Sequence, residues 1–185
     1  LYVPLQRRVG WNLGDVGLIL IIDIAADAII DTVRLRYKNP IYSCRVGNDI
    51  YLSCAAMWET LDDGAIEVFH MVSRTVETVM TEQQLGGSPV TMQHIEGSRF
   101  YVEVYQGWNN VQVKEVDFSA ARVIATLPGI TDAFGTIVYD SISQRLFVGE
   151  RTPNESGIKV FDRSNSLVTG PLSMPLPPYF MCILD

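Results

Sequence analysis

The sequence has no long hydrophobic run and no large basic cluster. Its longest uninterrupted apolar stretch, residues 18–22, ends at Asp23, whereas a transmembrane helix needs roughly 20 apolar residues. Arg7 and Arg8 form the only adjacent basic pair, and the formal net charge is -7. Proteins that bind nucleic acid usually gather Lys and Arg on one face. We therefore expect neither a membrane span nor a nucleic-acid partner.

The sequence also lacks the common motifs of catalytic and cofactor sites. It contains no Gly-rich phosphate loop, no nucleophile elbow and no HExxH motif. His94 is one of only two histidines, and it has no second potential ligand at metal-binding spacing. From these absences we expect no catalytic residue, no metal ion and no cofactor.

Helical periodicity is almost absent too. Segments such as AIIDTVRL, RVIATL and IKVFD are rich in Ile, Val and Thr, which is typical of strands, and turn residues interrupt them at intervals of about 8 to 12 residues. With 48% hydrophobic and 19% charged residues among 185, the composition is that of a globular protein. The sequence predicts a single all-β domain over residues 1–185.

Two sets of residues repeat along the chain with one period. The aromatic residues Tyr2, Tyr51, Tyr101 and Phe147 recur at spacings of 49, 50 and 46, and the residues Asp23, His70, Asp117 and Asp162 recur at spacings of 47, 47 and 45. A period of about 47 residues that holds four short strands is typical of a β-propeller blade, which is a four-stranded antiparallel sheet. The chain is therefore predicted to be a β-propeller, or part of one, with about four blade equivalents.

The repeat also predicts the strands of each unit. The units are expected at about 1–38, 40–88, 89–132 and 134–177. Strands are expected at 40–46, 49–55, 65–72 and 75–82 in the second unit, at 90–95, 99–105, 111–118 and 122–127 in the third, and at 135–139, 145–150, 158–161 and 167–172 in the fourth.

The two ends of the sequence allow two interpretations. The first unit begins directly with the second strand of a blade, and the final segment PPYFMCILD looks like another innermost strand, because Pro178 and Cys182 repeat Pro40 and Cys44. Either residues 178–185 complete the first blade and close a four-bladed ring, or the strand is missing and the chain is a portion of a larger propeller. We favour the portion, because four blades is the lower end of the range. An open arc exposes strand edges and is expected to self-associate.

Three segments carry a resemblance to a known family. The stretches VDFSAARVIATLPG (116–129), SISQRLFVGE (141–150) and SGIKVFDRSNSLVTG (156–170) resemble the YVTN family of β-propeller repeats. The resemblance spans nearly the whole chain, is closest in the third unit and is loosest in the second, where His70 replaces the usual Asp. It implies a propeller fold and, since family members are mostly secreted or surface proteins, a location at the cell surface, outside the cell or in the periplasm.

The three tryptophans recur in the same connection of successive blades. Trp58 and Trp108 each follow their anchor tyrosine by seven residues, and Trp11 follows its anchor by nine. The connection from second to third strand is expected on one rim of the propeller. The expected ligand-binding residues are Trp11, Trp58, Glu59, Trp108, Asn109 and Asn110, because Trp offers a stacking face and its neighbours offer hydrogen bonds. The other interpretation is that the rings fold down and seal the end of the core, and it is the one we favour, because large aromatic side chains usually lie where they can bury area.

The remaining polar residues have structural interpretations. Asp23, Asp117 and Asp162 end third strands, where a carboxylate accepts backbone N–H groups of the following turn, and His70 is expected in the same role. A hairpin centred on Asp49 would place Cys44 opposite Cys54, which predicts a disulfide between them.

These features favour a non-catalytic binding or scaffold module outside the cytoplasm, with a protein or carbohydrate partner. Two alternatives stay open. One is a propeller oxidoreductase or lyase subunit with a cofactor or metal in the central channel and His94 as a ligand. The other is an architectural surface-layer repeat.

Overall fold

The protein is built from strands arranged in separate antiparallel sheets. The computed structural model describes residues 1–10, 12–58, 60–153 and 155–183. Three sheets have four strands each, one has three, and a two-stranded hairpin projects from the three-stranded sheet. The all-β propeller architecture expected from the repeat is confirmed. In the described residues, no helix is long and apolar enough to cross a membrane.

Each sheet corresponds to one repeat of the sequence, and we name the sheets blades 1 to 4 in chain order. Blade 1 contains β1 (Tyr2–Leu5), β4 (Leu18–Asp23) and β5 (Ala28–Arg34), with the hairpin β2 (Arg8–Val9) and β3 (Asn12–Leu13) between its first two strands. Blade 2 contains β6 (Pro40–Val46), β7 (Asp49–Cys54), β8 (Ala65–His70) and β9 (Thr75–Thr81), followed by helix α1 (Glu82–Leu85). Blade 3 contains β10 (Ser88–Glu96), β11 (Arg99–Gly107), β12 (Asn110–Asp117) and β13 (Arg122–Thr126). Blade 4 contains β14 (Ile137–Asp140), β15 (Arg145–Glu150), β16 (Gly157–Phe161) and β17 (Leu167–Ser173). The strand ends expected in blades 2 to 4 differ from these by two residues at most.

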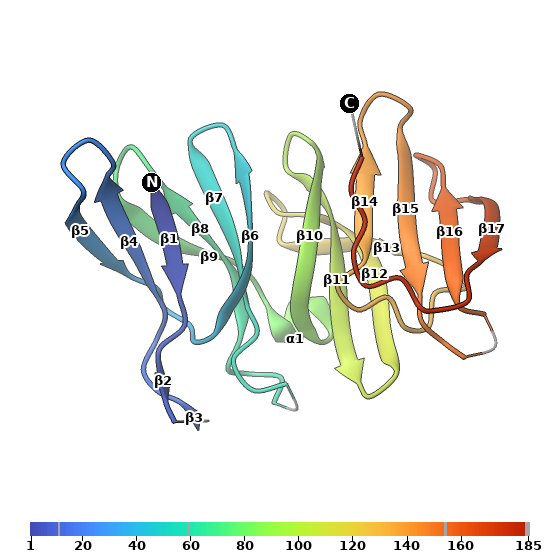
Figure 1. Ribbon diagram of the computed structural model, residues 1–185, viewed down its shortest axis with the longest axis horizontal. Helices are drawn as coiled ribbons and strands as arrows, with labels where there is room; N and C mark the ends of the chain where they lie inside the picture. Colours follow the sequence, from blue (N-terminus) through green and yellow to red (C-terminus); the bar gives the residue numbers. More distant parts are fainter. Residues whose placement is uncertain (11, 59, 154, 184–185) are drawn as a thin grey trace.

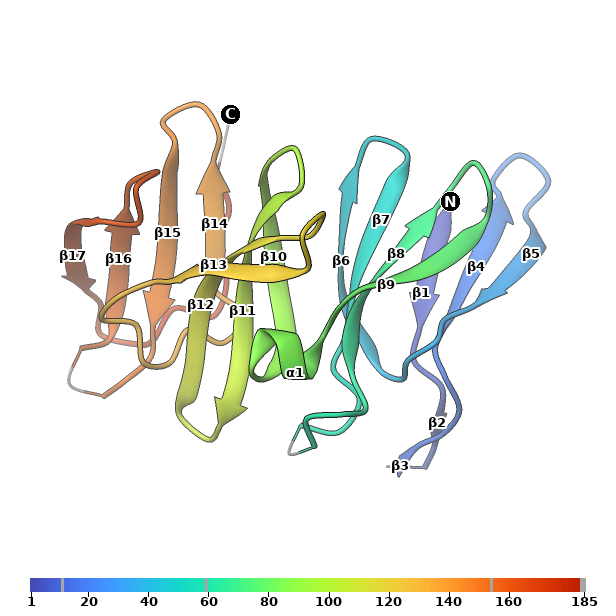
Figure 2. The ribbon, with the colours of Figure 1, turned by 180° about the vertical axis from the view of Figure 1, so that it is seen from behind.

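The four blades stand in a row as an open arc. Figures 1 and 2 show blade 1 at one end of the row and blade 4 at the other. The innermost strands of blades 2, 3 and 4, which are β6, β10 and β14, lie side by side along the row. Within the described part of the chain, β1 pairs only with β4, and residues 174–183 form no strand. The closed four-bladed ring is therefore not formed. The final segment instead runs beside β14 of its own blade 4.

The hydrophobic core consists of three layers, each lying between neighbouring blades. The residues of one blade that face the preceding blade occupy the same repeat positions throughout. These positions are Ile50, Phe100 and Leu146 on the second strand, Leu52, Val102 and Val148 two residues further along that strand, and Phe69, Val116 and Phe161 on the third strand. All nine side chains are 8% exposed or less. Each blade is therefore stabilised mainly by the apolar area that it buries against its neighbours.

The predicted disulfide does not form, because the hairpin of blade 2 has a different register. Val46 pairs with Asp49 across a two-residue turn in which Gly47 has a φ of 59°. This register places Cys44 opposite Tyr51 and Pro40 opposite Cys54. Both cysteines are free thiols. Because side chains alternate between the faces of a strand, a small change of turn position separates residues that another register would pair.

The recurring aspartates stabilise the turns after the third strands, as expected. Asp117 accepts the backbone N–H groups of Ser119 (3.0 Å) and Ala120 (3.4 Å), and the hydroxyl groups of Ser119 and Ser98 lower the pKa of its carboxyl group to about 2. Asp23 and Asp162 accept backbone N–H groups of their own turns in the same way. His70 differs, because its Nδ1 contacts the carboxylate of Asp49 on the neighbouring strand at 2.7 Å.

Glu103 lies fully buried on β11 and fixes the connection that leads into blade 4. Its carboxylate accepts the backbone N–H groups of Gly135 (2.6 Å) and Thr136 (2.7 Å) and the hydroxyl group of Thr91 (2.8 Å). Burial nevertheless raises the pKa of Glu103 to about 7, because desolvation of the charged form outweighs these hydrogen bonds.

This raised pKa predicts a loss of stability as the pH rises. The folded chain binds the proton of Glu103 more tightly than the unfolded chain, whose pKa is 4.5. The stabilisation is complete below pH 4.5 and is lost as the pH rises through 7, by about 3 kcal/mol in the free energy of unfolding. Urea unfolding at pH 5 and pH 8 measures the loss. The variant Glu103→Gln has no titrating group at this position, so its free energy of unfolding should not show the part of the loss that comes from Glu103. Identical pH profiles for the two proteins would contradict the raised pKa of Glu103.

Candidate functional site

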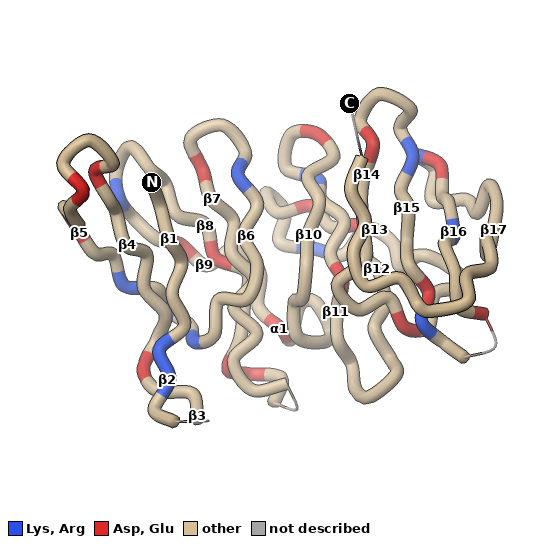
Figure 3. The backbone as a smooth tube through the Cα atoms, viewed as in Figure 1, with Lys and Arg blue, Asp and Glu red and all other residues tan. Residues whose placement is uncertain are grey.

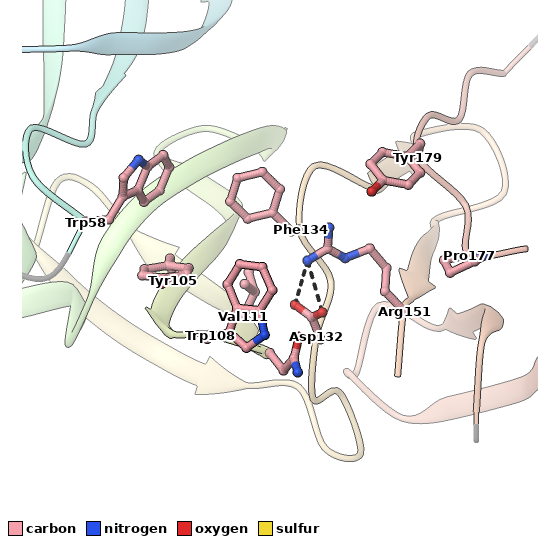
Figure 4. A pocket seen from close by; sticks show the side chains of 10 residues that line it. Trp58, Tyr105, Trp108, Val111, Asp132, Phe134, Arg151, Pro177 and Tyr179 are labelled. Carbon is pink, nitrogen blue, oxygen red and sulfur yellow. Dashed lines mark hydrogen bonds and ion pairs between the residues drawn. The ribbon is translucent and has the colours of Figure 1, made fainter. Parts of the chain in front are cut away.

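The connections at one end of blades 2, 3 and 4 enclose a pocket of about 590 Å³, which we call the rim pocket (Figure 4). Its volume lies in the range of about 300–1,000 Å³ that is usual for small-molecule sites. It is lined by Trp58, Tyr105, Trp108, Asn109, Val111, Asp132, Phe134, Arg151, Pro177 and Tyr179. Five of these ten residues are aromatic, so the walls are mainly flat apolar rings.

The aromatic rings of the rim pocket come from four separate segments. Trp58, in the β7–β8 connection, packs edge-on against Tyr105 at the end of β11, with ring centroids 5.2 Å apart. It also contacts Phe134, which precedes β14, at 5.7 Å. Tyr179 lies across the pocket, in the segment that follows β17. The pocket therefore depends on the packing of three consecutive blades.

A tight turn projects Trp108 into solvent beside these rings. Gly107 pairs with Asn110, so that Trp108 and Asn109 form the two-residue β11–β12 turn. Asn109 has a φ of 55°, a left-handed conformation that Asn adopts more readily than most residues. Trp108 is 87% exposed. Its ring therefore contributes little to the core and does not seal the blade beneath it.

An ion pair between Asp132 and Arg151 supplies the charged groups of the pocket. Nη2 of Arg151 donates to both carboxylate oxygens of Asp132 at 3.0 Å, and the guanidinium carbon lies 5.1 Å from the centroid of Phe134. The pair is largely buried, with side chains 5% and 20% exposed. Nη1 of Arg151 makes no hydrogen bond to the described residues, so it offers donor groups to a ligand. The two charges cancel, which leaves the pocket polar at its edge and without net charge.

Buried contacts hold the segment that carries Asp132. The carboxylate of Glu150 accepts the backbone N–H groups of Thr131 (2.9 Å) and Asp132 (3.0 Å). Nζ of Lys159 lies 3.4 Å from the same carboxylate and donates to the carbonyl of Gly129 at 2.6 Å. Glu150 is 0% exposed. These contacts fix the position of the ion pair before any ligand binds.

The structure brings together some of the residues expected to bind a ligand. Trp58, Trp108 and Asn109 line the rim pocket. Asn110 is exposed at the start of β12 and does not line it. Trp11 and Glu59 lie outside the described residues.

The repeat pattern did not indicate the other residues of the pocket. Tyr105 and Arg151 hold the same repeat position, four residues after the anchors Tyr101 and Phe147, but they are different residue types. Phe134 and Tyr179 come from the segments before β14 and after β17. The only signal in the sequence was that the second-to-third-strand connections should lie on one rim. That rule places Arg151 on the same rim as Trp108, but it does not distinguish Arg151 from its neighbours and does not indicate Phe134.

His94 lies away from the rim pocket, near the β10–β11 turn. Its Nε2 lies 3.1 Å from the carbonyl oxygen of Gly97, and its ring packs against Phe100 at 5.0 Å. The described residues contain no group of three or more His, Cys, Asp or Glu side chains arranged to hold a metal ion. Nothing in the surroundings of His94 supports its role as a ligand.

The charges of the chain are distributed over all four blades. Figure 3 shows Lys and Arg along the whole row, interspersed with Asp and Glu. The expectation that the chain has no nucleic-acid partner stays a prediction. The rim pocket itself has one charged residue of each sign.

Comparison with known proteins identifies the fold. No family model matches the sequence, and no curated protein matches it. The designed protein Ika8 is similar at 11% identity and a TM-score of 0.65, over 93% of this chain and 51% of that chain. The designed protein Ika4 is similar at 14% identity and a TM-score of 0.61, over 83% of this chain and 84% of that chain. Hydrazine synthase of Kuenenia stuttgartiensis is similar at 16% identity and a TM-score of 0.60, over 79% of this chain and 45% of that chain.

These likenesses define the class of the protein and no more. The chain is an all-β protein with a propeller-like fold. It spans about half the length of Ika8 and of the hydrazine synthase chain. Membership of the YVTN family is not shown, because the likeness to solved structures concerns the fold alone and no family model matches.

Proposed function

We propose that the chain is a non-catalytic recognition module that binds a carbohydrate in the rim pocket. The observation that carries this proposal is the combination of exposed and half-buried aromatic rings with the Asp132–Arg151 pair. A sugar ring has a flat face of C–H groups that packs on an aromatic side chain, and hydroxyl groups at its edge that need directed hydrogen bonds. Trp108 and Tyr179 supply exposed faces, and Arg151 and Asn109 supply polar groups.

The neutral charge balance of the pocket favours an uncharged ligand. Asp132 and Arg151 satisfy each other at 3.0 Å, and a charged ligand would have to compete with that contact. An uncharged polyol only needs donors and acceptors that the pair leaves unused. A protein partner is the alternative occupant, since Trp, Tyr and Arg are also the residues enriched where proteins bind one another.

The location and the family stay part of the proposal. A position outside the cytoplasm and membership of the YVTN family are both supported only by the resemblance of the sequence segments. The free thiols of Cys44 and Cys54 supply no argument for an oxidising compartment. An architectural surface-layer repeat is the remaining alternative, and it would show ordered self-association and no binding of a small molecule.

A binding panel tests the proposed ligand. The fluorescently labelled chain is applied to immobilised neutral oligosaccharides of glucose, galactose, mannose and N-acetylglucosamine. We expect saturable binding to at least one of them, with competition by the same sugar in solution. Absence of binding to every neutral sugar would contradict the proposal. Selective binding to a protein at the same residues would replace the carbohydrate by a protein partner.

A further inference from the structure

The connection between β13 and β14 carries Phe134 into the rim pocket, and buried carboxylates hold this connection on both sides of Phe134. Glu150 accepts the backbone N–H groups of residues 131–132. Glu103 accepts those of residues 135–136, at 2.6 and 2.7 Å. Both glutamates are 0% exposed. The position of Phe134 therefore depends on Glu103 as directly as on Glu150.

Phe134 links the carboxylate of Glu103 to the other walls of the rim pocket. Its ring packs against the indole ring of Trp58, with centroids 5.7 Å apart, and the guanidinium carbon of Arg151 lies 5.1 Å from its centroid. Gly135, whose N–H group Glu103 accepts, is the next residue in the chain and has a φ of 77°, a conformation that glycine adopts without strain. A change in the hydrogen bond of Gly135 is therefore transmitted directly to an aromatic wall of the pocket.

The hydrogen bonds of Glu103 suit a charged carboxylate. Its Oε2 accepts the hydroxyl group of Thr91 and the N–H group of Gly135, and its Oε1 accepts the N–H group of Thr136. A charged carboxylate accepts at both oxygens, whereas a protonated carboxyl group has one oxygen that donates. Hydrogen bonds to an ionised acceptor are also about twice as strong as neutral ones. Since each oxygen accepts one backbone N–H group, protonation at either oxygen weakens a backbone contact.

The charge of Glu103 changes near neutral pH. Desolvation raises its pKa to about 7, against the effect of its three hydrogen bonds and of the positive charge of Arg151. Among the described residues, Arg151 faces it from blade 4 and the phenol group of Tyr42 faces it from blade 2. Burial raises the pKa of Tyr42 above its ordinary value of 10, so this phenol stays neutral. Glu115, on the same face of the neighbouring strand β12, is paired with two arginine side chains.

We propose that Glu103 is a positioning residue of the rim pocket and makes ligand binding depend on pH. The charged carboxylate holds Phe134 in its place in the pocket wall, and protonation releases the segment around it. This proposal rests on the binding role of the rim pocket. If only the charged form binds, the binding-competent fraction falls from about 0.9 at pH 8 to about 0.1 at pH 6, so the apparent dissociation constant rises about tenfold.

The expected pH dependence of binding has the opposite sign to that of stability. Protonation of Glu103 raises the free energy of unfolding, because the folded chain binds this proton more tightly than the unfolded chain. A lower pH should therefore stabilise the fold while it weakens binding. A residue that only supported the fold would change stability and binding in the same direction.

The ligand-free chain tests the first step of the proposal. The indole N–H signal of Trp58 and the amide signals of Gly135 and Thr136 are followed from pH 5 to pH 9 in ¹⁵N-labelled protein. We expect the three signals to shift with one midpoint near pH 7 in the wild type and not to titrate in Glu103→Gln. Histidine is the other residue type that titrates in this range. The control variant His94→Gln, in the same blade, should leave the three midpoints unchanged.

Binding to the immobilised neutral oligosaccharides of the panel, at pH 6 and at pH 8, tests the second step. Wild-type binding should be about tenfold weaker at pH 6. Glu103→Gln resembles the protonated acid, because its side-chain amide has one donor and one acceptor group. It should bind equally weakly at both pH values.

Three results would overturn the proposal. The first is that the signals of Trp58, Gly135 and Thr136 do not shift between pH 5 and pH 9, which decides the matter even if Glu103→Gln does not fold. The second is that they shift equally in Glu103→Gln, or lose their midpoint in His94→Gln. The third is a sugar that binds the wild type equally at pH 6 and pH 8. Signals that titrate as expected in a chain that binds no sugar would support the role of Glu103 and contradict the carbohydrate ligand alone.

Discussion

Replacing Trp108 by alanine is expected to weaken binding at the rim pocket by at least tenfold and to leave the melting temperature unchanged. The side chain is 87% exposed, so the fold loses almost no buried area when it is removed. A tryptophan at the centre of a binding surface is worth about 2 kcal/mol or more, which corresponds to a change of roughly thirtyfold in the dissociation constant. Isothermal titration with the sugar selected by the panel gives the affinity, and differential scanning calorimetry gives the melting temperature.

A matched control separates the loss of a binding residue from the loss of any exposed apolar residue. Ile142 is 88% exposed in the β14–β15 turn, at the opposite end of the blades from the rim pocket. The variant Ile142→Ala should change neither affinity nor melting temperature. If Trp108→Ala bound the sugar as tightly as the wild type, the ring would have no role in recognition. If it lowered the melting temperature by several degrees, the ring would have a packing role.

The variant Glu150→Ala is expected to lower the free energy of unfolding by about 3–5 kcal/mol, the usual cost of removing one partner of a buried ion pair. Its carboxylate accepts the backbone N–H groups of Thr131, Asp132 and Thr152, at 2.9, 3.0 and 3.3 Å, and lies 3.4 Å from Nζ of Lys159. Alanine would leave these donors buried without an acceptor. Because the N–H of Asp132 is one of them, the ion pair with Arg151 should also move and ligand binding should weaken.

Glu155 provides the control for this second prediction. It contacts the same Nζ of Lys159 at 2.8 Å, but its side chain is 60% exposed. An exposed ion pair contributes about 1 kcal/mol or less, so Glu155→Ala should be close to the wild type in chemical unfolding and in affinity. Equal losses for Glu150→Ala and Glu155→Ala would contradict the structural role that we assign to Glu150.

The repeat made the strands and the core predictable from the sequence. Each blade packs against its neighbours through the faces of its sheet, so apolar residues recur at the same repeat positions, such as Leu52, Val102 and Val148. The agreement of two independent sets of anchor residues fixed the period, and the period fixed the strands. The turn aspartates were predictable for the same reason, because every third strand ends in a similar turn.

The details that no repeat controls were not predictable. Whether Cys44 faces Cys54 depends on the φ of Gly47 and the length of one turn, and the period of 47 residues carries no information about it. The rim pocket is assembled from connections that differ in every blade. Trp58 and Trp108 are predictable because the same residue type recurs, whereas the repeat counterpart of Arg151 is Tyr105, a different residue type, and no recurring residue type marks Phe134.

The most direct test of the binding proposal is a titration of the ¹⁵N-labelled chain with the selected sugar, followed by the indole N–H signals in a ¹H–¹⁵N correlation spectrum. The sequence has three tryptophans, so the spectrum has three such signals, and Trp→Phe variants assign them. Saturable shifts of the Trp58 and Trp108 signals, with the same dissociation constant as calorimetry, are the predicted result. Sugar binding that leaves both of these signals unmoved would place the ligand outside the rim pocket and contradict the account.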